Sequence, residues 1–100
     1  MAIEVVLAET AWHDLDEIYD WVADRSDPDT AQKYVGRILR LCGSLGEFPK
    51  RGAPRDDLAQ GIRTIAFERR ATIAYQVRRN TVLVLHVFHH GRDHRRAFSP

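Results

Sequence analysis

The stretch that decides the fold is GIRTIAFERRATIAYQVRRNTVLVLHVFHH, from Gly61 to His90. It holds three runs rich in β-branched and aromatic residues, separated by two polar segments, Glu68-Arg69-Arg70 and Arg79-Asn80. Such runs with short polar segments between them indicate strands joined by turns. The stretch therefore predicts a meander of three antiparallel strands, near 61–67, 71–78 and 81–89.

The strands of this meander differ in how much of their surface is apolar. Ile73, Tyr75 and Val77 alternate with small or polar residues, so the middle strand has one apolar face. The last strand is apolar on both faces from Val82 to Val87, which is typical of a central strand.

The first half of the chain begins with a predicted strand near 2–7 and then takes on helical periodicity. Apolar residues recur at helical spacing over 9–24 and again over 28–46. Asp27 suits the N-cap of the second helix and Pro28 its first position. The short connection predicts an antiparallel helical hairpin. Four acids of the first helix are expected on its solvated face: Asp14, Asp16, Glu17 and Asp20.

The element order is thus β-α-α-β-β-β, an α+β fold with the helical hairpin packed on an antiparallel sheet. One hundred residues suffice for one domain, 1–100. Residues 49–60, with two prolines and a glycine, are expected to form a loop. The side chains expected to be buried are Ile18, Val22, Val35, Ile38, Leu39, Ile73, Tyr75, Val77 and Leu85.

Charge is strongly polarised along the chain. Residues 49–100 carry eleven Lys and Arg against four acids, a net charge of +7, whereas residues 1–48 carry four against ten, a net charge of −6. Thirteen of the fifteen basic residues are arginines, whose planar fork suits carboxylate and phosphate groups. The basic half is therefore expected to meet an anionic or acidic partner.

Several function classes are disfavoured. No run approaches the length of a membrane span, and the N-terminus lacks the basic and apolar regions of a signal peptide, which favours a cytoplasmic protein. Cys42 is the single cysteine and falls on the apolar stripe of the second helix, so we expect a buried small hydrophobe. No spacing of cysteines or histidines predicts a metal site, and no cofactor is expected.

Motifs spread along nearly the whole chain resemble the ParE branch of the RelE/ParE superfamily of bacterial type II toxins. They are Ala11-x3-Leu15-x2-Ile18-x2-Trp21, Phe48-Pro49-x2-Gly52, Gly61-Ile62-Arg63, Ile73-x-Tyr75-x-Val77 and Val87-Phe88-His89-His90-Gly91-Arg92-Asp93. The resemblance implies a toxin neutralised by a cognate antitoxin, with DNA gyrase as the target in the ParE branch and ribosome-bound messenger RNA in the RelE branch. One departure is that the family's first helix often begins Ser-Pro, whereas this chain has Ala8-Glu9, which leaves Thr10 or no side chain to cap it.

The resemblance also implies a role for Arg63, because RelE-like nucleases use a basic residue here to hold the scissile phosphate. The alternative is a sheet-edge arginine that pairs with Asp56, Asp57 or an antitoxin carboxylate. His89 and His90 are the nearest matches to the histidine that serves as acid or base in some RelE-type nucleases. His86, His89, His90 and His94 could instead be partly exposed strand and tail residues.

The expected function is therefore a ParE-like toxin that inhibits gyrase by binding. Arg63, Arg92, Arg95 and Arg96 would contact the target. Trp12, Tyr19, Trp21 and Tyr34 would contact an acidic, apolar-dotted antitoxin segment that is disordered when free. Two alternatives stay open, a ribosome-dependent endoribonuclease that uses Arg63 with His89 or His90, and an inactive member that survives as a complex subunit.

Overall fold

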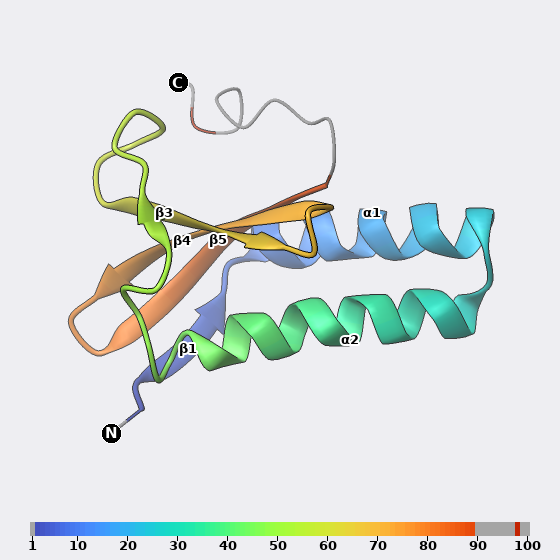
Figure 1. Cartoon of the computed structure of the whole chain (residues 1–100), viewed down its shortest axis with the longest axis horizontal. Helices are drawn as coiled ribbons and strands as arrows, with labels where there is room; N and C mark the ends of the chain where they lie inside the picture. Colours follow the sequence, from blue (N-terminus) through green and yellow to red (C-terminus); the bar gives the residue numbers. More distant parts are fainter. Residues whose placement is uncertain (1, 90–97, 99–100) are drawn as a thin grey trace.

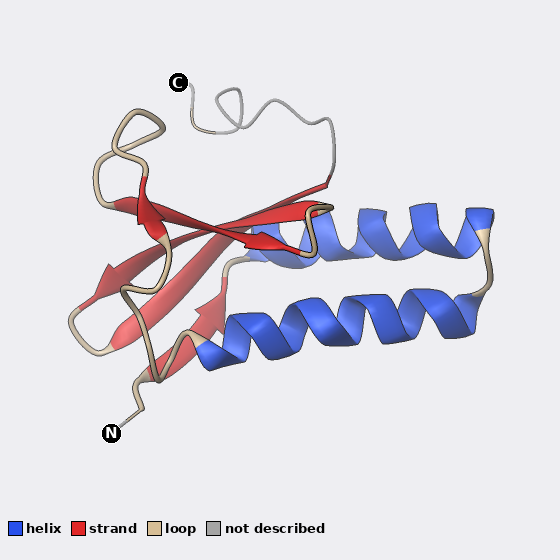
Figure 2. Ribbon diagram, in the orientation of Figure 1, coloured by secondary structure: helices blue, strands red, loops and turns tan. Residues whose placement is uncertain are grey.

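The computed structural model of the chain describes residues 2–89 and Phe98. Its elements follow the order β1 (Glu4–Leu7), α1 (Glu9–Arg25), α2 (Pro28–Ser44), β2 (Ala53–Pro54), β3 (Ile62–Phe67), β4 (Ala71–Arg78) and β5 (Thr81–His89). The two helices form an antiparallel hairpin on one side of a twisted sheet (Figures 1 and 2). The predicted α+β fold, with its hairpin and its three-strand meander, is confirmed.

The sheet has five strands in the order β1-β5-β4-β3-β2. The meander β3-β4-β5 is antiparallel and β5 is central, as predicted. Two details of the prediction were wrong. Strand β1 pairs parallel to β5, with the helical hairpin and strands β2 to β4 between them in the chain. The prediction missed this direction because alternation of apolar residues does not encode it. Residues Ala53–Pro54, expected in a loop, form the short edge strand β2 against β3.

The register of β4 and β5 contains one bulge. Ala74 pairs with His86 and Tyr75 pairs with Val84, so Leu85 is an extra residue on β5. A bulge bends its strand and re-aims the side chains that follow it. Consequently Val84 and Val87, three positions apart, both belong to the core that faces the helices.

The helix ends follow from their caps. Asp27 accepts a hydrogen bond from the amide of Thr30 at 2.7 Å, and Pro28 takes the first position of α2, as predicted. Helix α1 starts after Ala8 with no side-chain cap, and the Thr10 hydroxyl instead donates to the carbonyl of Leu85 on β5. The helices end at Arg25 and Ser44, within two residues of the predicted positions.

Two apolar clusters hold the layers together. The larger lies between the hairpin and the sheet, and the smaller lies on the other face, around Leu58, Ile62, Ala74 and Phe88. The predicted core residues Ile18, Ile38, Ile73 and Tyr75 are buried. The other five are only partly buried because they pack at the rims of these clusters: Val22, Val35, Leu39, Val77 and Leu85. Within residues 2–89 and Phe98, neither helix has the length and apolar character needed to cross a membrane.

Candidate functional site

Arg63, near the start of β3, is bound to the backbone of the loop that precedes β2. Its Nη1 donates to the carbonyl of Gly52 at 2.6 Å and to that of Lys50 at 3.2 Å. The amide of Gly52 donates in turn to the buried hydroxyl of Tyr75 at 2.7 Å. A Cβ at Gly52 would come within 2.7 Å of the Tyr75 hydroxyl and of the Thr64 carbonyl, so only glycine fits there. We call this arrangement of Arg63, Gly52 and Tyr75 the Arg63 clamp.

The aspartates that were considered as partners of Arg63 make other contacts. Arg55 forms a bidentate ion pair with Asp57, at 2.9 and 3.0 Å. Asp56 accepts a hydrogen bond from the amide of Gly61 at 2.9 Å. The hydrogen bonds that Arg55 donates to Asp57 raise the pKa of the Arg55 guanidinium.

A shallow hollow lies beside the Arg63 clamp, between the loop after α2 and Val77, with a volume of about 770 Å³. Phe48 lines it and is 63% exposed, more than any other large hydrophobic side chain among the described residues. Lys50, Arg51 and the acidic Glu47 also line it. The Phe48-Pro49 motif of the sequence thus forms an open apolar surface with charged neighbours of both signs.

His89 lies far from Arg63. In the sheet register Arg63 pairs with Tyr75, whereas His89 pairs with Ala71, four positions further along β4. Four positions correspond to about 13 Å along a strand. The structure therefore does not bring Arg63 together with His89, one of the two histidines considered for a phosphate-cleaving site, and His90 lies outside the described residues.

His89 packs instead into a group of rings from the helical hairpin. Its ring meets Trp21 edge to face, with centroids 4.8 Å apart, and its Nε2 lies 3.3 Å from the hydroxyl of Tyr34. Burial raises the pKa of Tyr34, so its phenol is neutral at physiological pH. Tyr34 also meets Phe67 of β3 edge to face, at 5.5 Å. The end of β5 is thereby fixed between α1 and α2.

These rings form the floor of a pocket of about 630 Å³ at the closed end of the helical hairpin, which we call the hairpin pocket. Its lining comes from the end of α1, the start of α2, the turn between β3 and β4, and His89. Five cationic side chains and no acidic ones are among the described residues that line it: Arg25, Lys33, Arg37, Arg69 and Arg70.

Three contacts order this cationic rim. The guanidinium of Arg25 lies 4.1 Å from the ring centroid of Trp21. Arg37 forms a bidentate pair with Glu68, at 2.9 and 3.2 Å, and lies 5.4 Å from the centroid of Tyr34. The hydrogen bond from Arg37 lowers the pKa of Glu68. Glu68 therefore partly neutralises Arg37.

The turn that presents Arg69 and Arg70 has an unusual backbone. Glu68 and Arg69 have φ angles of 47° and 59°, and the amide of Arg70 donates to the carbonyl of Phe67 at 2.8 Å. Positive φ at both central residues defines a type I′ turn, which strongly prefers Asn-Gly. Glutamate and arginine thus occupy positions where the backbone favours other residues.

The prediction for Asp14 was wrong. Predicted on a solvated face, this carboxylate is 7% exposed and its Oδ2 accepts from the amide of Val87 and lies 3.0 Å from His86 Nδ1. Strand β1 pairs with β5 only as far as Val84, so α1 covers the edge of β5 beyond that point. Asp14 supplies the acceptor that a neighbouring strand would otherwise offer. The signal in the sequence was its position on the apolar stripe of α1, three residues after Ala11 and four before Ile18.

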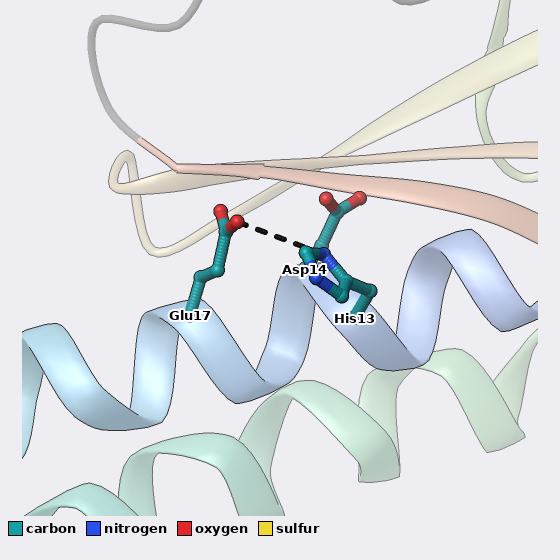
Figure 3. Close-up of side chains that lie close together, drawn as sticks. All are labelled: His13, Asp14 and Glu17. Carbon is teal, nitrogen blue, oxygen red and sulfur yellow. Dashed lines mark ion pairs between the residues drawn. The ribbon is translucent and has the colours of Figure 1, made fainter.

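His13 and Glu17 lie beside Asp14 on α1, and one possible ligand atom from each of the three falls within 4.8 Å of the others (Figure 3). His13 and Glu17 form an exposed i, i+4 pair at 3.6 Å. Asp14 is directed to β5, where its Oδ2 meets the Val87 amide and His86. This grouping is explained by the helix spacing and by the capping of β5.

Two of the four aromatic residues predicted to bind an antitoxin line the hairpin pocket. Trp21 and Tyr34 meet in the hairpin pocket, where Trp21 is 45% exposed and Tyr34 is buried. Trp12 is 49% exposed but does not line the pocket, and neither does the partly buried Tyr19. The predicted residues His90, Arg92, His94, Arg95 and Arg96 lie outside the described residues. Cys42 is buried as predicted, and burial raises its pKa to about 11.

The chain was compared with protein families and with solved structures. The family model described as the ParE toxin of the type II toxin–antitoxin system parDE matches residues 5–94. A chain of the chromosomal ParDE toxin–antitoxin system of P. aeruginosa is 26% identical, with 88% of this chain and 96% of that chain covered and a TM-score of 0.78. No curated protein matches the chain by sequence.

Two further solved structures share the fold. A chain of the RelBE2 toxin–antitoxin complex of Mycobacterium tuberculosis is 23% identical, with 89% of this chain and 99% of that chain covered and a TM-score of 0.66. A conserved hypothetical protein of Helicobacter pylori, solved in solution, is 11% identical, with coverages of 90% and 97% and a TM-score of 0.55.

Proposed function

The chain belongs to the ParE toxin family of type II toxin–antitoxin systems, and we propose that it arrests bacterial growth by binding DNA gyrase. In this proposal it acts in the cytoplasm, needs no cofactor, and is neutralised in a complex with a cognate ParD-like antitoxin. The similarity to a ParDE system, with 26% identity over most of both chains, supports this branch of the superfamily.

The Arg63 clamp is the observation that favours inhibition by target binding over RNA cleavage. A catalytic arginine must turn its guanidinium to the scissile phosphate. Nη1 of Arg63 already donates to the carbonyls of Gly52 and Lys50, and His89 lies about four strand positions away in an aromatic cluster. Arg63 is therefore proposed to act on the target through the loop that it holds.

We assign direct target contact to the basic tail, through Arg92, Arg95 and Arg96, and to the open surface around Phe48 beside the Arg63 clamp. Exposed apolar patches rimmed by polar residues often mark protein interfaces. The antitoxin is proposed to cover the helical hairpin, where Trp12, Tyr19, Trp21 and Tyr34 lie.

Brief induction of the toxin in a bacterium tests this proposal. Gyrase inhibition predicts an SOS response, filamentous cells and intact transcripts. Cleaved transcripts with an arrest of translation would instead identify an endoribonuclease, and unimpeded growth would identify an inactive member of the family.

Two sets of substitutions separate binder from nuclease in the same assay. Changing Arg92, Arg95 and Arg96 to Glu should abolish growth arrest, because it reverses the charge of the proposed contact. Changing His89 and His90 to Gln removes two titrating groups and should leave most of the arrest. A general acid or base contributes about 10²–10⁴-fold, so loss of activity in a folded histidine variant would favour the nuclease.

A further inference from the structure

We infer that Phe98 is a positioning residue, whose ring docks on the outer face of the sheet and thereby holds the basic tail near that face. The outer face is the face of the sheet opposite the helical hairpin. The inference rests on the proposed function for one step only, which is that the arginines of the tail contact the target. The docking of Phe98 itself is argued from the contacts of the described residues.

Two rings of β5 form the surface on which Phe98 docks, and we call them the outer-face platform. His86 and Phe88 lie two positions apart on the strand and stack, with ring centroids 5.1 Å apart and an interplanar angle of 16°. The ring of Phe98 meets both of them edge to face, with centroids 5.4 Å from His86 and 6.1 Å from Phe88. Both distances lie in the range that aromatic pairs prefer, about 4.5–7 Å.

The platform is held in place by contacts that do not involve Phe98. Nδ1 of His86 lies 3.0 Å from Oδ2 of Asp14 on α1. Phe88 belongs to the buried apolar cluster of the outer face, together with Leu58, Ile62 and Ala74. A surface that is already in place binds a side chain with little further loss of conformational entropy.

Phe98 is the only large hydrophobic side chain among residues 89–100. Apolar burial is therefore available to this end of the chain at one position only. The last residues of a domain are usually poorly ordered unless a contact ties them down. The contact of Phe98 with the outer-face platform supplies such a tie, ten residues after Phe88.

Docking of Phe98 limits where the neighbouring arginines can be. Arg96 and Arg95 precede Phe98 by two and three residues in the sequence. A chain spans at most about 3.3–3.6 Å per residue, so their Cα atoms must lie within about 11 Å of that of Phe98. Undocked, the same arginines could spread over a larger volume, which would have to be given up when the target binds. Docking should therefore raise the affinity of the tail for the target.

The test compares the unaltered full chain with Phe98→Ala, Phe98→Tyr and Ser99→Ala. Trypsin cleavage after the arginines of the tail, followed by mass spectrometry, measures how often the tail is undocked. The NMR signals of the His86 and His13 rings report the contact itself. Inhibition of DNA supercoiling by gyrase measures the action on the target, and urea unfolding measures the stability of each variant.

We expect Phe98→Ala to speed cleavage in the tail about tenfold, because proteolysis follows the population of the open form. It should shift the ring signals of His86 and not those of His13, which is exposed on α1. The concentration that half-inhibits gyrase should rise about tenfold. Phe98→Tyr keeps the ring and should match the unaltered chain in all three readouts. Ser99→Ala changes the adjacent residue and should match it as well.

A substitution on the platform tests the same contact from the other side. Phe88→Leu keeps an apolar side chain in the buried cluster and removes one of the two rings. It should also speed cleavage in the tail. Combined with Phe98→Ala it should add little to the effect of Phe98→Ala alone, because both changes remove one shared contact. Effects that multiply independently would overturn the inference.

The remaining outcomes are also decisive. If Phe98→Ala weakens gyrase inhibition while tail cleavage and the His86 signals stay unchanged, Phe98 touches the target directly and the inference is wrong. It is also wrong if Phe98→Ala only lowers the urea midpoint, or if it frees the tail without weakening inhibition. If Phe98→Ala changes cleavage and the His86 signals as expected, but the unaltered chain does not inhibit gyrase, the docking of Phe98 stands and the proposed function fails.

Discussion

The Arg63 clamp and the hairpin pocket both depend on arginines, yet they use them in opposite ways. At the clamp, Nη1 of Arg63 donates to two backbone carbonyls, so the side chain organises a loop. At the pocket, five exposed cations, of which Arg37 is paired with Glu68, surround an aromatic floor with no acid among the described lining residues. Surface arginines are thus informative only when the partners of their donors are known. The clamp should control stability, whereas the pocket should control binding.

The largest effect is expected in the core that supports the pocket. Ile38 is completely buried one turn after Tyr34 on α2, and Ile38→Ala should lower the free energy of unfolding by about 2–5 kcal/mol. Its neighbour Leu39 is only partly buried, so Leu39→Ala should cost clearly less. Urea unfolding of both variants measures the difference. Equal losses would show that the rim of the core is as tightly packed as its centre.

The next largest effect on stability is expected where Asp14 of α1 contacts β5. Asp14→Ala would leave the buried amide of Val87 without its acceptor and His86 without its carboxylate, at a cost of about 1–3 kcal/mol. Asp16→Ala removes an exposed acid two residues away and should change stability by less than about 0.5 kcal/mol. A loss shared by both variants would indicate a general effect of charge on α1.

The contrast between these two acids also shows how far the sequence could reach. Hydrophobic periodicity predicted both helices, the meander and the central position of β5, because burial on a regular element repeats at a fixed spacing. The same spacing puts Asp14, unlike Asp16, on the apolar face of α1 between Ala11 and Ile18. It could not identify the partner of Asp14, because that partner is a strand edge left open where β1 ends. The direction of β1 was missed for a related reason, because alternation of side chains does not depend on strand direction.

The candidate site was partly predictable. Trp21 and Tyr34 were selected as binding residues from composition, and they do meet in the hairpin pocket. Arg69 and Arg70 were recognised only as turn residues, because their place on the rim depends on the path of the type I′ turn. The contact of Arg63 with Gly52 arises from an edge strand of two residues, which is too short to leave a periodic signal.

A smaller effect is expected from two substitutions, one in the Arg63 clamp and one in the hairpin pocket, that change stability and binding separately. Tyr75→Phe removes the acceptor of the Gly52 amide and should lower stability by about 1–2 kcal/mol, without changing binding of the proposed antitoxin at the hairpin. Arg70→Gln is exposed and should do the reverse, with unchanged stability and weaker binding. Chemical denaturation measures the stability of both variants, and calorimetry measures their binding. If Tyr75→Phe also weakened binding, the two regions would be coupled through the sheet.

The smallest expected effect lies at the hairpin turn beside the pocket and depends on pH. The hydrogen bond from the Thr30 amide lowers the pKa of Asp27 below its ordinary value of 3.8. A lowered pKa means that the cap stabilises the folded chain above the ordinary value and that this stabilisation is lost as pH falls through the lowered one. Asn caps helices about as well as Asp but does not titrate. Asp27→Asn should therefore match the unaltered chain at pH 7 and lose less stability between pH 5 and pH 2. Asp16→Asn, with the same change in charge, is the control for urea midpoints measured across that range. A variant as sensitive to acid as the unaltered chain would show that the cap does not depend on the charge of Asp27.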